Sequence, residues 1–263
     1  DPAACALPWP SSLYLEPREE TATGVRLTFD EGSLPRNNRR AGFDPALFDG
    51  LDGYGLGSSI MVSLGEIDYR ELPGEWDRLE QSVAADSPTL LFEVSDAGLE
   101  PVPHFVEPDL GADPERPLTY LRPAVVLEPA TRYVVAFRNL RTVDGAPVEA
   151  SPAFRALRDG RPSADPGIEA RRERFETIFA QLEAAGVARD ELVLAWDFVT
   201  GSEAALHRRL DRAIELALAE APDGGTITVD AVETFVAEDD GSDAPIDPFL
   251  RYRVRATMRR PMV

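Results

Sequence analysis

Residues 132–140, with the sequence RYVVAFRNL, form an apolar run of the kind that builds a β-strand. Runs of similar character lie at 59–64, 89–94 and 118–122, and turns rich in Pro and Gly separate them. The Asp144-Gly145 pair follows at a position where a tight hairpin turn is expected. Short strands separated in this way predict a sandwich of two β-sheets.

The pattern changes after Gly160, and a helix is predicted over 165–186. Asp165 is a suitable N-cap, Pro166 a suitable first helical residue, and Gly186 is placed to end the helix. Apolar residues recur at helical spacing on one face: Phe175, Ile178, Phe179, Leu182 and Ala185. Because charged residues occupy the rest of the helix surface, this stripe should pack on the sandwich.

A second helix is expected after the N-cap Ser202, and β-like runs flank it at 192–200, 226–235 and 250–258. The predicted fold class is therefore α+β and mainly β, a sandwich with an inserted or appended helical pair. Three parts are expected along the chain. They are an extended segment packing on the core (1–57), the sandwich with its inserted helix (58–202), and a helix plus β-strands that continue beyond Val263 (203–263).

Charge narrows the classes of partner. The 263 residues include 47 acidic and 27 basic side chains, which gives a net charge of -20, and every basic residue is Arg. Such a surface repels phosphate backbones and anionic lipid, so no nucleic acid is expected as a partner. The absence of Lys excludes Schiff-base chemistry and a phosphate-loop lysine.

The start of the chain bears on localisation. No apolar run approaches the ~18 residues that a membrane-spanning helix needs. The first residue is Asp1, not Met, which fits an exported protein after removal of its signal peptide, although a cloning boundary would look the same. Cys5 is the only cysteine, so it forms no internal disulfide, and a plain structural role is expected for it.

No complete catalytic motif is present. The G-x-S-x-G turn of α/β-hydrolases is absent, and the nearest strings, Gly57-Ser58-Ser59 and Gly201-Ser202, lack the second glycine. His104 and His207 are the only histidines; the first is expected to be packed and the second solvated on a helix. The sequence therefore predicts no catalytic residue and no cofactor.

Metal binding and ligand stacking are also not expected. The acidic loop 238–243 contains Asp239, Asp240 and Asp243, which are weak calcium candidates because the alternating order of a calcium loop is missing. Asp49 and Asp52 form a weaker candidate still. Trp9, Trp76 and Trp196 are expected in the core, with Trp196 supported by the apolar run around it.

Part of the chain resembles a known family. The segments that carry the resemblance are 117–123 (PLTYLRP), 127–135 (LEPATRYVV), 185–187 (AGV) and 194–200 (LAWDFVT). Their order is similar to the N-terminal domain of bacterial virulence-factor lipases, which are exported proteins, and the match covers about 118–202. The segments 117–123 and 127–135 resemble a pair of strands from a bacterial Ig-like domain, and the second of them carries the Tyr-x-Val pattern.

The resemblance implies an Ig-like sandwich that precedes an α/β-hydrolase domain. No residue here matches a catalytic position of that family. The leading interpretation is a non-catalytic accessory or binding module of an exported bacterial lipase- or esterase-like protein, with the hydrolase domain as partner. Two alternatives stay open. One is a free-standing Ig-like ligand-binding or adhesion module, and the other is a part of a carboxylic-ester hydrolase whose catalytic domain lies elsewhere.

Overall fold

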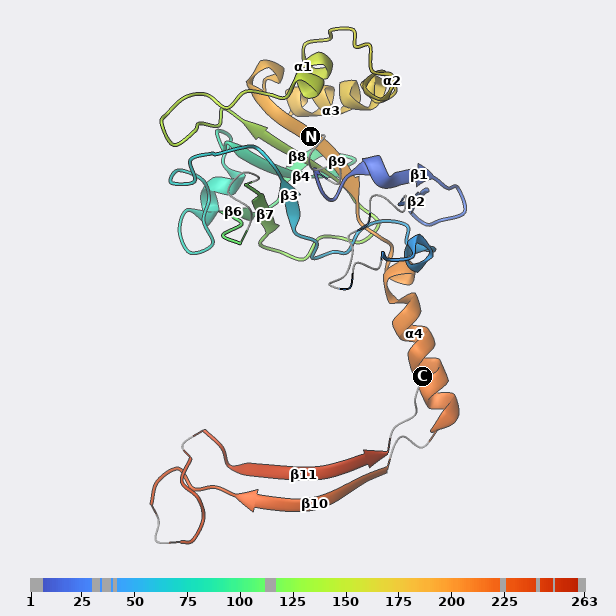
Figure 1. Cartoon of the computed structure of the whole chain (residues 1–263), viewed down its shortest axis with the longest axis vertical. Coiled ribbons are helices and arrows are strands. Elements are labelled where there is room, and N and C mark those ends of the chain that lie inside the picture. The colour runs from blue at the N-terminus through green and yellow to red at the C-terminus, as the bar shows by residue number, and fades with distance from the viewer. Residues whose placement is uncertain are drawn as a thin grey trace. The chain divides into compact units, whose positions relative to one another are not determined.

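The computed structural model (Figure 1) describes residues 7–29, 34, 39, 42–111, 117–222, 226–239, 242–247 and 249–259. Cys5 and Asp240 lie outside these ranges. The chain divides into two compact units, Asp1–Leu206 and His207–Val263, which are taken in turn. The fold is mixed α/β, its sheets are antiparallel, and the described strands form no closed barrel.

A four-stranded antiparallel sheet forms the centre of the first unit, in the order β5-β4-β8-β9. Its strands are β4 (Thr89–Ser95), β5 (Gly98–Pro101), β8 (Arg132–Arg138) and β9 (Leu192–Val199). In β8, Val135 pairs with Leu91 of β4 on one side and with Trp196 of β9 on the other. Every residue of β8 after Arg132 is buried, so both faces of this sheet are covered.

A three-stranded sheet covers one face. Its order is β3-β7-β6, with β3 at Ile60–Val62, β7 at Thr119–Pro123 and β6 at His104–Pro108. The two sheets share one hydrophobic cluster, whose members include Leu91, Tyr133, Val135, Phe137 and Phe198 from one sheet and Ile60, Val62, Val106 and Leu121 from the other. The expected packing of two antiparallel sheets is therefore present.

Helices cover the other face of the four-stranded sheet, as Figure 1 shows. They are α1 (Pro152–Arg158), the short α2 (Pro166–Glu169) and α3 (Arg172–Ala184). Ile178, Phe179 and Leu182 of α3 are fully buried against Val134 and Ala136 of β8. The predicted docking of the apolar stripe on the sheet is confirmed.

The predicted boundaries of this region needed correction in two places. One continuous helix over 165–186 is wrong, since α2 ends at Glu169 and α3 begins at Arg172. The predicted ends are correct, because Asp165 Oδ1 accepts a hydrogen bond from Gly167 N and Gly186 has a φ of 83°. Helix α1 was not predicted, although Ser151 caps it and Pro152 occupies its first turn.

The stretch 101–117 is rich in proline and lies between the apolar runs 89–94 and 118–122, where turns were expected, but it contains the strand β6. This strand pairs with β7 alone and lies at the edge of its sheet. An edge strand tolerates prolines because one side of its backbone has no partner strand to donate to. Pro108 ends the strand, and the sequence 104–107 between Pro103 and Pro108 supplies the ladder.

The second unit has a different character. The division falls within α4 (Glu203–Glu220), and the strands β10 (Thr226–Thr234) and β11 (Tyr252–Arg259) pair antiparallel, with a bulge between Val229 and Ala231. Phe235 is the single buried side chain among the described residues of this unit. The cross-strand pairs Ile227–Met258, Val229–Ala256 and Val232–Val254 place apolar residues along one face of the hairpin, where they remain exposed.

The tryptophans do not share one environment. Trp196 is buried and its Nε1 donates a hydrogen bond of 2.8 Å to the carbonyl of Pro10, so its predicted place in the core is confirmed. Trp9 is half-buried against Phe29 and Tyr54. Trp76 is 90% exposed, so the expectation that it lies in the core is wrong. It lies in an irregular stretch after Gly74 that belongs to no strand or helix.

Two aromatic truncations should separate the buried layer from the surface. Phe179→Ala removes a side chain that is 0% exposed and should lower the free energy of unfolding by about 3–5 kcal/mol. Trp76→Ala removes a larger side chain that is exposed to solvent, so it should change the free energy of unfolding by less than about 0.5 kcal/mol. Urea denaturation followed by circular dichroism measures both. Equal midpoints for the two variants would contradict the assigned helix–sheet packing.

Candidate functional site

The two histidines lie in different environments. His104 is fully buried in β6, where its Nδ1 lies 2.9 Å from the carbonyl of Val102 and its Nε2 lies 3.0 Å from Thr89 Oγ1. Because a carbonyl only accepts, Nδ1 carries the proton and Nε2 accepts from the threonine. Burial lowers the pKa of His104 to about 4, so the ring is neutral near neutral pH. His207 is exposed on α4.

Ser59 and Ser202, one from each near-miss string, have structural partners. Ser202 Oγ donates to Asp52 Oδ2 at 2.7 Å and accepts from the backbone N–H of Ala205, so it caps α4. Asp52 Oδ1 also accepts from the backbone N–H of Ser202 at 2.9 Å. Ser59 Oγ accepts from Arg122 at 2.7 Å. Neither serine is paired with a histidine in the described part of the chain.

The same contacts bear on the metal candidates. Asp52 is buried, and both of its carboxylate oxygens are used by Ser202. No group of three or more His, Cys, Asp or Glu side chains with metal-binding geometry occurs among the described residues, which include Asp239 and Asp243. Asp240 is not described, so the expectation that this loop binds no calcium stays a prediction.

A pocket of 580 Å³ opens between the N-terminal segment, the helices α1 and α3, and strand β9. Its walls are mainly apolar and include Phe154, Leu157, Ile168, Phe175, Leu194 and Trp196. Its polar side chains belong to Ser11, Ser12, Ser151, Arg171, Arg174 and Asp197. Its size and its apolar lining with a few polar groups are typical of a small-molecule site.

Asp197 is the buried charge of this pocket, with its side chain 3% exposed. Arg132 Nε donates to Oδ2 at 2.6 Å, while Arg174 donates from Nε to Oδ1 and from Nη2 to Oδ2, both at 2.8 Å. Burial alone raises the pKa of Asp197, but the two guanidinium groups outweigh it and leave the pKa below its usual value. The aspartate is therefore ionised, and two arginines share its single charge.

Arg174 also ties the N-terminal segment to the helical layer. Its Nη2 donates to Ser12 Oγ at 2.6 Å, and its side chain is still 45% exposed. Arg132 Nη1 donates to Gln181 Oε1 at 2.9 Å, which adds a second contact to α3. The ion cluster thus joins β8, β9, α3 and the N-terminal segment, and Ser12, Arg174 and Asp197 of this cluster line the pocket.

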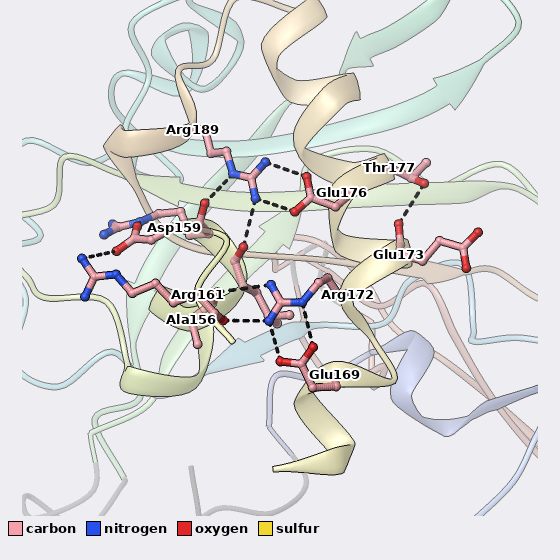
Figure 2. Close-up of polar contacts among 11 residues, drawn as sticks. Ala156, Asp159, Arg161, Glu169, Arg172, Glu173, Glu176, Thr177 and Arg189 are labelled. Atoms are coloured by element: carbon pink, nitrogen blue, oxygen red, sulfur yellow. Dashed lines mark hydrogen bonds and ion pairs between the residues drawn. The ribbon is translucent and has the colours of Figure 1, made fainter. Parts of the chain in front are cut away.

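A second arginine network fixes α1 against α3 (Figure 2). Arg189 makes a bidentate pair with Glu176 and donates to the carbonyl of Leu157 at 2.9 Å. Arg172 makes a bidentate pair with Glu169 and donates to the carbonyl of Arg161 at 2.8 Å. Guanidinium groups at these carbonyls satisfy the C-terminal end of α1 and favour its dipole. The two helices that line the pocket are therefore held together from their polar side.

The sequence did not single out Arg132, Arg174 or Asp197. A signal was present, since Asp197 interrupts the apolar run 192–200 and a charge inside such a run needs a buried partner. The partners themselves lie 65 and 23 residues away along the chain, so no local spacing reveals them.

Comparison of the chain with protein-family models, with curated proteins and with solved structures gave no match. Within the described residues, no helix combines the length and the apolar character that crossing a membrane requires.

The buried histidine predicts a specific pH dependence. Its folded pKa of about 4 lies below the ordinary value of 6.5, so its contribution to stability is complete above pH 6.5 and is lost as pH falls toward 4. The loss amounts to ~3 kcal/mol at ~1.4 kcal/mol per unit. His104→Gln should remove this slope between pH 6.5 and 4.5, whereas His207→Gln should retain it.

Urea denaturation at several pH values measures the slope. The carboxylates that pair with arginine change the stability at lower pH. Hydrogen bonds with Arg172 and Ser163 lower the pKa of Glu169 to about 2. Its contribution to stability is therefore lost only as the pH falls below 4.5, the ordinary pKa of a glutamate. An unchanged slope in His104→Gln would show that the ring is not the group that titrates.

Proposed function

We propose that this chain is a non-catalytic binding module whose ligand occupies the pocket between α1, α3, β9 and the N-terminal segment. The observation that carries the proposal is the pocket itself, which at 580 Å³ falls within the range of small-molecule sites. Its walls come from segments held in place by two arginine networks, so the site is preorganised.

Catalysis by the isolated chain is not part of the proposal. The nucleophile turn is missing from the sequence, and His104 hydrogen-bonds within the core instead of with a serine. Ser12 and Ser11 line the pocket, but Ser12 Oγ accepts from Arg174 and Ser11 Oγ accepts from the backbone N–H of Leu13. Both hydroxyl groups have structural partners, and neither is next to a base that would activate it.

The sequence resemblance supports a wider interpretation of this binding module. In that interpretation it is an accessory module of an exported bacterial lipase- or esterase-like protein, with an α/β-hydrolase domain as partner. One contact supports the Ig-like interpretation of the packed sheets. Tyr133 Oη accepts a hydrogen bond of 2.8 Å from the backbone N–H of Glu128, five residues upstream. A tyrosine that bonds back to the backbone in this way is characteristic of Ig-like sandwiches.

The free-standing binding module is the second candidate. It is favoured by one observation, namely that every residue lining the pocket belongs to the first unit. Binding would then need no further domain.

Binding can be tested with a neutral probe. N-phenylnaphthylamine, which fluoresces in apolar sites, should bind the full chain at one saturable site. Ala153 lines the pocket, so Ala153→Phe should fill space and weaken binding about tenfold or more. Ala180→Phe adds the same ring to an exposed position of α3 outside the lining and should leave affinity unchanged. Equal affinity of both variants would place the probe elsewhere and contradict the proposal.

The absence of catalysis has its own test. The isolated chain should not turn over short p-nitrophenyl esters above the background rate, because the His104 ring bonds to Val102 and Thr89 in the core and not to a serine. The measurement is release of p-nitrophenol at neutral pH. Saturable turnover that a single Ser or His substitution abolishes would overturn the non-catalytic interpretation.

A further inference from the structure

The charged residues that line the pocket carry a surplus of positive charge. They are Arg171, Arg174 and Asp197, and Arg132 pairs with the same aspartate from outside the lining. The single carboxylate is already paired with Arg132 and Arg174, and Arg171 adds a further positive charge to the lining, although the whole chain carries a net charge of -20. In so acidic a protein, a local excess of cations in the lining of an apolar pocket favours an anionic ligand.

The donors that would receive this ligand are not used up by the protein. Arg171 is exposed and has no ion pair among the described residues, and Arg174 Nη1 has no acceptor among them. The two arginines are three positions apart at the start of α3, where neighbouring side chains lie on the same side. A guanidinium fork matches the paired oxygens of a carboxylate or a phosphate.

The remainder of the lining is suited to an apolar body. Phe154 and Phe175 come from the helical layer, Trp196 comes from β9, and Leu13 comes from the N-terminal segment. A ligand that places an alkyl or aryl group here removes apolar surface from water on both sides, which strengthens binding about threefold for each buried CH₂ group.

We propose that the pocket takes an amphipathic molecule whose anionic oxygen head, a carboxylate or a phosphate, lies at Arg171 and Arg174 and whose apolar body lies against Phe154, Phe175 and Trp196. This inference rests on the proposed binding function and specifies its ligand class. Arg171 supplies the charge-assisted contact, while Arg174 is held in place by Asp197 and Ser12.

The test compares three probes of equal chain length on the full chain: dodecanoate, dodecyl phosphate and dodecanol. Affinities are measured below the micelle concentration by displacement of N-phenylnaphthylamine and by tryptophan fluorescence in a Trp76→Phe background, in which Trp9 and Trp196 remain. At least one of the two anions should bind about tenfold or more tightly than dodecanol. Shortening the anion from dodecanoate to decanoate should weaken binding about threefold or more per CH₂ group.

Arg171→Gln is the decisive variant, because Arg171 has no protein partner among the described residues whose loss would disturb folding. It should weaken the anion about fivefold to tenfold and leave dodecanol unchanged, a smaller effect than for a buried donor because the side chain is exposed. Arg171→Glu should weaken the anion further. Arg70→Gln removes an equal charge from the first unit outside the lining and should have no effect.

The outcomes separate the ligand class from the binding function. Equal affinity for dodecanol and both anions, or an unchanged anion affinity in Arg171→Gln, overturns the anionic head and leaves the proposed pocket standing. Binding that is absent for all three probes and for N-phenylnaphthylamine overturns both. A selective loss of anion affinity in the Arg171 variants supports the inference.

Discussion

The burial of β8 on both faces is the constraint on which the first unit depends. Tyr133, Val135 and Phe137 face the three-stranded sheet, while Val134 and Ala136 face the helices. One strand therefore supplies two separate cores, and a slip of one residue in its register would exchange the two sets of side chains. The pairing with β4 and β9 holds that register, and the layers above and below follow from it.

Few charged side chains are buried in the first unit, and Asp197 is one of them. Burying Asp197 is unfavourable unless its oxygens are paired, and Arg132 and Arg174 pair with both of them. The pairing also fixes the direction of α3 across the sheet and holds the N-terminal segment at Ser12. The pocket lies between the N-terminal segment, α3 and β9, which this polar cluster connects.

Local signals in the sequence predicted many of the strands and helix ends. The apolar runs marked β3, β4, β7, β8 and β9, and Asp165, Gly186 and Ser202 marked helix ends through capping chemistry. The errors also have physical causes. Prolines concealed the edge strand β6, and the three-layer arrangement, with helices on one sheet face, depends on contacts that no single run contains. The Ig-like relationship remains a proposal.

The pocket lay beyond sequence reasoning for a related reason. Its lining joins residues near position 10, near 154, near 172 and near 196, and only the folded chain brings these together. An aspartate inside an apolar strand was the one visible sign, and the sequence alone does not name its partners. Functional sites built between layers are in general less readable than the layers themselves.

The contact between Trp196 and Pro10 has a consequence for biosynthesis. The two residues are 186 positions apart, and Ser12 and Arg174 are 162 apart. A ribosome releases the N-terminal segment before β9, which is the last strand of this unit, so Pro10 and Ser12 emerge long before their partners in β9 and α3 exist. Contacts of such long range slow folding. The N-terminal segment therefore reaches its final position only after β9 has left the ribosome.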